Sequence, residues 1–95
     1  MPAARLLLFA RAREAAGRRD DTVELVEGAT LSDVLTVARE RYSSEFAEVL
    51  DASRVWVNGD EPAFGGATPL VDGDEVAILP PVSGGGDGKG SRYPD

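Results

Sequence analysis

The composition of the chain changes abruptly after Val82, and this change limits what the chain can fold into. Residues 83–90 are mostly glycine, and residues 91–95 (Ser-Arg-Tyr-Pro-Asp) offer little that a core could bury. A segment of this kind gains too little from burial to offset the entropy of ordering it. We therefore expect one domain over residues 1–82, too short for a second hydrophobic core, followed by a flexible C-terminal tail over residues 83–95.

Three segments near the N-terminus carry clear local patterns. Residues 5–10 form an almost continuous apolar run, which predicts a strand that is buried on both faces or lies at the centre of a sheet. Residues 11–17 have high helix propensity and end in glycine, so a short helical turn is expected. Residues 21–26 alternate in polarity like a half-buried strand, and the first strand is its simplest pairing partner.

A helix is predicted to begin after Thr30, with Thr30 as the N-cap and Asp33 in the acidic first turn. Apolar residues then recur on one face, which we expect to pack on the sheet as core. The pair at residues 43–44 interrupts this stripe, and residues 45–51 form a second, shorter helical piece. The members of the stripe are Leu31, Val34, Leu35, Ala38 and Tyr42.

The second half of the domain is predicted to consist of strands and turns. Residues 54–57 form a strand, and the Asn-Gly pair at residues 58–59 is the strongest turn signal. Residues 61–64 are expected to return as a brief edge strand, where a proline is tolerated. Residues 72–74 form a turn before the last strand, residues 75–79. This order predicts an α+β domain of β-grasp (ubiquitin-like) type, a mixed sheet of four to five strands crossed by one main helix.

Missing residue types exclude several kinds of chemistry. The chain has no cysteine and no histidine, which argues against disulfides, thiol catalysis, a zinc site and a serine–histidine triad.

The apolar run near the N-terminus is too short for a signal peptide, and the residues that follow it are too charged. No segment approaches the roughly 20 apolar residues of a membrane span. We expect a cytoplasmic protein that does not enter a membrane.

Charge narrows the choice of partners. A net charge of −7 argues against nucleic acid, because phosphate binding needs a basic face. The charge suits docking on a positively charged protein, although a soluble acidic shell is the simpler interpretation. Lysine occurs once, as Lys89 in the tail, so the domain offers no internal amine for ubiquitin-type chain building on itself. A codon bias explains this arginine preference more simply.

The most diagnostic segment is residues 72–85, Asp-Gly-Asp-Glu-Val-Ala-Ile-Leu-Pro-Pro-Val-Ser-Gly-Gly. It resembles the C-terminal end of the MoaD family, the small subunits of molybdopterin synthase. Residues 9–14 (Phe-Ala-Arg-Ala-Arg-Glu), followed by Gly17, resemble the beginning of the same family. The resemblance covers residues 5–85 in element order and is to ubiquitin-like sulfur carriers of the MoaD/ThiS type.

The resemblance implies a reaction at the glycine pair. Gly85, preceded by Gly84, would be adenylated by an E1-like enzyme (MoeB/ThiF type) and converted to a thiocarboxylate that donates sulfur. The chain would bind no cofactor and no metal, and ATP would be used by the E1-like partner. The chain end would work inside a molybdopterin synthase large subunit (MoaE type) or another sulfur-accepting enzyme. The chain would then be a sulfur-donating subunit without an active site of its own.

The residue types of this segment suit such a reaction for physical reasons. Pro80 and Pro81 fix two φ angles and remove two N–H donors, which holds Leu79 extended and stops the strand. Gly84 and Gly85 have no side chains, so their backbone can pass through a narrow channel. An isolated run of glycines is more often a flexible linker. Its position directly after a strand and Pro-Pro-Val favours the carrier.

Partner contacts are expected around the base of the tail. Residues 80–82 form that base, and Leu79 and Phe9 are candidates for an apolar docking face. Arg13 matches an arginine that, by the family resemblance, helps dock the carrier on its activating enzyme. A solvated arginine on a helical turn is an equally good interpretation.

The sequence departs from the family pattern at its C-terminal end. Ten further residues, 86–95, follow Gly85, so Gly85 has an amide carbonyl that cannot be adenylated. We expect a processing protease to cut at the Gly85–Gly86 bond or, as second choice, at Gly86–Asp87. Otherwise the protein has left the pathway.

Other functions stay open at this point. A sister sulfur carrier would supply cysteine, thiamine or another sulfur-containing product, and a protease-gated tail fits such control of sulfur release. A non-catalytic β-grasp interaction module would bind a partner through its sheet and tolerate truncation after Val82. A stand-alone enzyme is the weakest alternative, because its chemistry would rest on Asp, Glu, Arg and Tyr alone.

Overall fold

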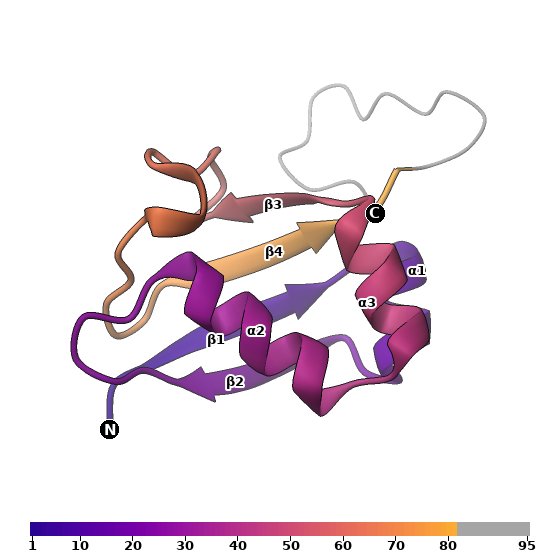
Figure 1. The fold of residues 1–95 in the computed structure, drawn as a ribbon, viewed down its shortest axis with the longest axis horizontal. Helices are drawn as coiled ribbons and strands as arrows, with labels where there is room; N and C mark the ends of the chain where they lie inside the picture. Colours follow the sequence, from indigo (N-terminus) through magenta and orange to yellow (C-terminus); the bar gives the residue numbers. More distant parts are fainter. Residues whose placement is uncertain (82–95) are drawn as a thin grey trace.

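The fold is a mixed four-stranded sheet with helices packed against it, as a computed structural model describes it for residues 1–81 (Figure 1). The predicted tail, residues 83–95, lies outside the described residues. The elements in chain order are β1 (Ala3–Leu8), α1 (Ala10–Ala16), β2 (Asp20–Glu24), α2 (Leu31–Arg41), α3 (Ser44–Asp51), β3 (Arg54–Val57), a 3-10 turn (Gly65–Ala67) and β4 (Glu75–Leu79).

β1 lies at the centre of the sheet, whose strand order is β2-β1-β4-β3. β1 pairs antiparallel with β2 and parallel with β4, and β3 pairs antiparallel with β4. The predicted central position of the first strand and its pairing with the second are therefore confirmed. Only alternate residues of β1, namely Ala4, Leu6 and Leu8, are buried, so this strand is not buried on both faces.

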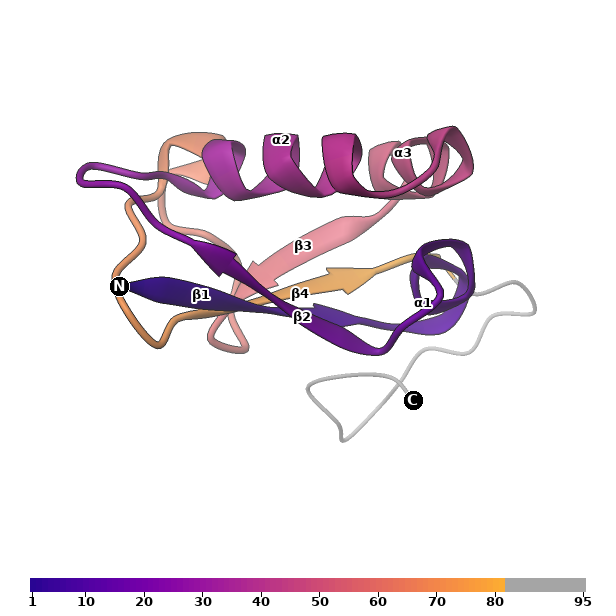
Figure 2. The same cartoon turned by 90° about the horizontal axis from the view of Figure 1, so that it is seen from below.

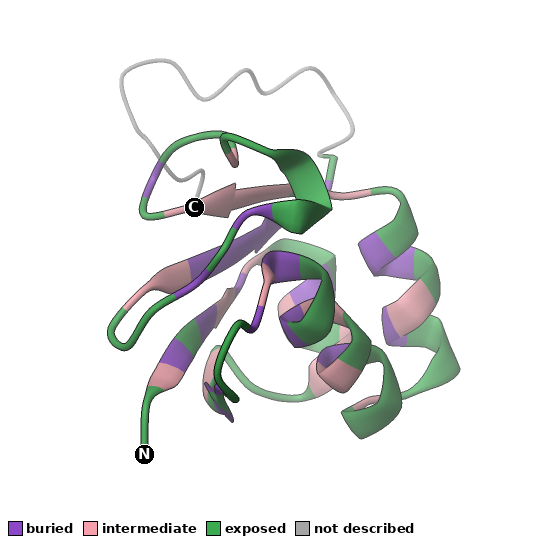
Figure 3. Ribbon diagram, turned by 60° about the vertical axis from the view of Figure 1, so that its left-hand side comes forward, coloured by how far each residue is buried: buried purple, intermediate pink, exposed green. Residues whose placement is uncertain are grey.

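The core lies between the sheet and two helices that cover one of its faces. α2 and α3 lie over this face (Figure 2), and each helix carries both buried and exposed positions (Figure 3). Leu6 and Ile78 from the central strands and Phe46 from α3 are fully buried in this layer. Each such side chain contributes roughly 1.5–3 kcal/mol on burial. The apolar stripe predicted for the long helix is thus core.

An N-cap begins each of these two helices, and the cap at Thr30 is the one that the sequence predicted. Thr30 and Asp33 form a capping box at the start of α2, in which the Thr30 N–H donates to the Asp33 carboxylate over 2.9 Å. Ser43 interrupts the helical pattern, because its Oγ accepts the Phe46 N–H over 3.1 Å and begins α3. Each cap contributes about 1 kcal/mol.

The predicted edge strand over residues 61–64 is wrong. The Asn-Gly turn at residues 58–59 forms with positive φ at both positions, but the returning chain makes one isolated bridge with β3. A proline in the segment has no N–H for a strand ladder, and the Phe64 N–H donates instead to Thr68 Oγ1 over 2.9 Å. Within residues 1–81 the sheet therefore has four strands and not five.

Gly17 ends α1 in the left-handed conformation. Its φ is 79° and its N–H donates to the Arg13 carbonyl over 2.9 Å, so the short helix that ends in glycine is confirmed. A side chain at this φ is strained even though a Cβ would meet nothing within 4 Å.

We expect Gly17→Ala to lower the free energy of unfolding by about 1 kcal/mol, the cost of a left-handed alanine. Gly66→Ala is the matched control, because its Cβ would meet Ser32 Cβ at an ordinary 3.5 Å. Urea denaturation of both variants measures the difference. Equal stability of the two variants would contradict the left-handed conformation of Gly17.

A polar cluster joins the edge strand β2 to the end of α2. Asp21 accepts hydrogen bonds from the Tyr42 hydroxyl and from Arg41 Nη1, the latter over 2.8 Å, and its side chain is 14% exposed. Burial alone raises the pKa of Asp21, but the hydrogen bonds from Tyr42 and Arg41 outweigh it and lower the pKa from 3.8 to about 2. Burial and the hydrogen bond to Asp21 raise the pKa of Tyr42 to about 12.

This cluster predicts a specific acid sensitivity. Because the carboxylate of Asp21 is favoured in the folded state, its stabilisation is fully present above pH 3.8 and is lost as the pH falls toward about 2. Asp21→Asn should therefore be less stable than the native chain by about 2 kcal/mol at neutral pH. The difference in the free energy of unfolding between the two proteins should disappear as the pH falls from 3.8 to about 2, as measured in a series of denaturation curves. A gap that stays constant with pH would contradict the cluster's role.

Candidate functional site

The parallel pairing of β1 with β4 brings two distant segments to the same edge of the sheet. Leu8 lies opposite Ile78 in this pairing. β1 ends at Leu8, and β4 ends one residue after Ile78, at Leu79, so the two strands end at the same side of the sheet, the first leading to α1 and the second to the tail (Figure 1). The two segments that the sequence singled out, around residues 9–13 and 79–81, meet at one end of the molecule.

Two prolines fix the exit of the chain from β4. Leu79 is the last residue of the strand and is 6% exposed. Pro80 is buried and Pro81 is exposed, so the chain leaves the fold between them. Neither proline has an N–H with which to continue the ladder. The predicted working end of the tail, with Val82, Gly84 and Gly85, lies outside the described residues.

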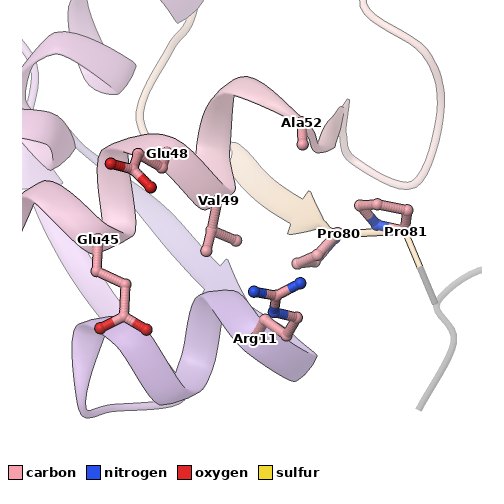
Figure 4. A pocket seen from close by; sticks show the side chains of 7 residues that line it. All are labelled: Arg11, Glu45, Glu48, Val49, Ala52, Pro80 and Pro81. Atoms are coloured by element: carbon pink, nitrogen blue, oxygen red, sulfur yellow. The ribbon is translucent and has the colours of Figure 1, made fainter. Parts of the chain in front are cut away.

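A groove of about 210 Å³ lies beside this exit, between α3 and the start of α1 (Figure 4). Aliphatic side chains and the two prolines supply its apolar surface, while one cation and two carboxylates supply its charge. Its lining residues are Arg11, Glu45, Glu48, Val49, Ala52, Pro80 and Pro81. The groove therefore offers a mixed docking surface directly at the base of the tail.

Sequence patterns do not single out Arg11, Glu45 or Glu48 as site residues. The one signal is that Glu45 and Glu48 are spaced i, i+3 on a helix and so share a face. That this face lies beside Pro80 depends on the packing of α3 against α1. This packing is a tertiary contact between segments that no local pattern links.

Arg13 supports the corner between β1 and α1. Its Nε donates to the Leu8 carbonyl over 3.5 Å, and the side chain is partly buried. Phe9, the N-cap of α1, is partly buried as well, and its carbonyl accepts the Ala12 N–H over 3.0 Å. The roles of Phe9, Leu79 and Arg13 in docking stay predictions, and the low exposure of Leu79 leaves Phe9 as the more accessible of the apolar pair.

The corner beside the exit carries backbone strain. Ala10 begins α1 with φ 50°, a left-handed conformation that costs an alanine roughly 1–2 kcal/mol. Strain of this kind persists only where the surrounding structure holds it. Here it turns the chain sharply from β1 into α1, which places Arg11 on the wall of the groove.

Neither a metal-binding cluster nor a membrane-spanning helix is found in the described part of the chain. Within residues 1–81, no group of three or more His, Cys, Asp and Glu is placed to hold a metal ion. None of the helices in that range has the length and apolarity to cross a bilayer. The site at this end of the sheet can present and position a chain end.

The mixed sheet has the topology of a ubiquitin-like β-grasp protein. In the sequence, two prolines and then a glycine pair follow β4, as is typical of the carriers with this fold. Comparison with known families agrees. The chain belongs to the ThiS family, which matches residues 6–85, and the resemblance to MoaD/ThiS-type carriers is confirmed.

Relatives and solved structures support the same assignment. The chain is 36% identical over 81 residues to the molybdopterin synthase sulfur carrier subunit of Chlamydomonas reinhardtii, covering 85% of this chain and 96% of that protein. It is 38% identical over 85 residues to small archaeal modifier protein 1 of Haloferax volcanii, covering 82% and 95%. A putative molybdopterin converting factor, subunit 1, from Pyrococcus furiosus has a TM-score of 0.76 at 30% identity, covering 86% and 100%. The predicted β-grasp fold is therefore confirmed.

Proposed function

We propose that this chain is a sulfur carrier that works as the small subunit of molybdopterin synthase in molybdenum cofactor biosynthesis. Its Gly85, once residues 86–95 are removed, is adenylated and thiocarboxylated. The observation that carries the proposal is the exit of β4. The chain leaves the fold between a buried Pro80 and an exposed Pro81, four residues before Gly85, and the family match ends at residue 85. The name of the C. reinhardtii relative supports the pathway.

In the proposed reaction the chain supplies only the acyl group, which is the carbonyl of Gly85. In an E1-like partner the Gly85 carboxylate attacks the α-phosphorus of ATP, and pyrophosphate leaves. A donor that delivers sulfide then attacks the Gly85 carbonyl carbon, and AMP leaves with the electrons of the carbon–oxygen bond. The thiocarboxylate that remains gives its sulfur to the substrate of a large catalytic subunit. With no His or Cys in the chain, the partners supply the acid–base chemistry.

Removal of residues 86–95 is a required step of this proposal, because an internal Gly85 has no carboxylate to activate. A protease that cuts between Gly85 and Gly86 supplies it. The carrier works in the cytoplasm, with protein partners and not nucleic acid. Its net charge of −7 favours positively charged docking surfaces on those partners.

The activation step can be tested with purified proteins. A form that ends at Gly85, incubated with ATP, an E1-like enzyme and a sulfide donor, should gain the mass of one sulfur-for-oxygen exchange. The full-length chain should gain nothing, because its Gly85 carbonyl is an amide. A form that ends at Val82 is the matched control that keeps the described fold. If the form that ends at Gly85 gains no mass with any E1-like enzyme of its cell, the proposal is wrong.

A second function is favoured by the similarity to small archaeal modifier protein 1, at 38% identity. In that case the activated Gly85 is passed to another protein, and the chain acts as a modifier. A sulfur carrier for cysteine, thiamine or another metabolite is the remaining alternative. A non-catalytic interaction module would bind its partner through the sheet and would not use Gly85.

Co-purification from the native host separates these functions. A molybdopterin synthase carrier should be recovered with the large subunit as a non-covalent complex and with a thiocarboxylate end. A modifier should instead be recovered as covalent species of higher mass that disappear when Gly85 is deleted. Recovery with a cysteine-synthase-like enzyme would favour the metabolite carrier, and activity that survives truncation after Val82 would favour the interaction module.

A further inference from the structure

The two outer strands of the sheet differ in what covers their free edges. β2 and β3 are the outer strands, and each directs some backbone N–H and carbonyl groups away from its neighbouring strand. Unpaired groups of this kind are a template on which another strand can add. The sheet can therefore be extended by a second protein only where these groups do not already have partners.

Side chains of the domain close the free edge of β2. The Thr22 N–H donates to Asp21 Oδ1 over 2.8 Å, and the Thr22 carbonyl accepts Arg41 Nη1 over 2.9 Å. Two residues back along the strand, the Asp20 carbonyl accepts Arg18 Nε, also over 2.9 Å. Because these groups already have partners, a strand that added to β2 would have to displace three hydrogen bonds.

The free edge of β3 is closed at one end only. The Asn58 N–H donates inward, to the Glu75 carbonyl next to β4, over 2.8 Å. The Val57 N–H donates outward, to the Asp60 carbonyl, also over 2.8 Å. These directions alternate along an antiparallel strand, so the backbone groups of Val55 face outward as well. No hydrogen bond within residues 1–81 reaches the N–H or the carbonyl of Val55.

Pro62 explains why the edge opens at Val55. The Asn-Gly turn sets Val57 opposite Asp60. If the hairpin continued, Pro62 would lie opposite Val55, but a proline has no N–H to donate to the Val55 carbonyl. The chain instead turns away, and the Pro62 carbonyl accepts the Gly65 N–H over 3.4 Å. The opening at Val55 therefore follows from a single residue of the sequence.

The open part of β3 lies beside the start of the tail. Arg54, the first residue of β3, is the pairing partner of Leu79, the last residue of β4. Figure 1 shows the chain leaving β4 next to this end of β3. A protein that takes hold of the tail therefore comes to lie against the open edge.

The charge around this edge selects the kind of strand that fits. Asp60 and Glu61, which follow the turn, are exposed. Glu61 lies 3.7 Å from Arg54, whereas Asp60 forms no ion pair within residues 1–81. A second copy of the chain would bring its own net charge of −7 and be repelled. A strand that carries lysine or arginine would be attracted.

We propose that the free edge of β3 at Val55 is a docking site for an extended, basic segment of the large catalytic subunit, which adds to the sheet beside β3. The N–H and carbonyl of Val55 exchange two hydrogen bonds with one residue of that segment, in an antiparallel arrangement. This inference rests on the proposed function, which supplies the large subunit. It gives that subunit a point of contact on the folded domain, in addition to the tail.

Amide hydrogen exchange, followed by NMR on the chain labelled with nitrogen-15, tests the site. In the free full-length chain the Val55 amide should exchange roughly tenfold or more faster than the Trp56 amide, which faces β4. In the complex between the purified large subunit and the form that ends at Gly85, exchange at Val55 should slow by roughly tenfold or more. Exchange at Thr22, on the other edge, should not change.

Two proline variants test the same hydrogen bond by affinity. Val55→Pro removes the outward N–H and keeps the ladder with β4, since an edge strand tolerates proline. Thr22→Pro is the matched control, because it removes the outward N–H of the other edge strand. In calorimetric titrations with the large subunit, Val55→Pro should bind roughly fivefold or more weakly, and Thr22→Pro should bind like the native chain. Melting curves verify that each variant is folded, and the exchange measurement decides if one is not.

The charge of the segment is tested by Asp60→Lys, which should also weaken binding. Unchanged affinity of this variant would overturn the basic character of the segment.

The outcomes separate the inference from the proposed function. A complex that forms without slowing exchange at Val55, or that binds both proline variants equally well, overturns the inference and leaves the proposed function standing. A large subunit that does not bind at all overturns both. Slow exchange at Val55 in the free chain also overturns the inference. Loss of that protection on dilution would identify a second copy on the edge, and its loss on removal of residues 86–95 would identify the chain's own tail.

Discussion

The parallel pairing of β1 with β4 is the constraint on which the rest of the structure depends. Parallel neighbours need a crossover that carries the chain back over the sheet, and here α2 and α3 lie within that crossover and cover one face. The same pairing places the carboxyl ends of both central strands at one edge. The chain end that leaves β4 therefore starts beside the corner that joins β1 to α1, at the end of the two central strands.

This placement divides labour between the domain and its tail. The domain supplies a rigid base, with Leu79 and Pro80 buried and Arg13 bonded to the Leu8 carbonyl. The tail, in our proposal, supplies a backbone end that is thin enough to enter another protein. The polar side chains that join β2 to the end of α2 lie in a separate place, in the cluster around Asp21.

Most of the fold could be predicted because its local signals agree with its tertiary contacts. The capping box at Thr30, the glycine stop at Gly17 and the turn before β4 are local chemistry, and each forms where the sequence places it. The strand predicted over residues 61–64 does not form, because a strand needs a neighbouring strand with free hydrogen-bonding groups. The periodicity of the sequence cannot reveal that the Phe64 N–H donates instead to the side chain of Thr68. The groove could not be predicted, since it arises only when α3 packs beside α1.

The central claim is that the chain end at Gly85 becomes a free acid and then carries sulfur. Intact-mass analysis of the protein isolated from its native host tests this most directly. We expect a population that ends at Gly85, part of which is heavier by one sulfur-for-oxygen exchange. A population made up solely of the 95-residue chain, with no form that ends at a glycine, would contradict it.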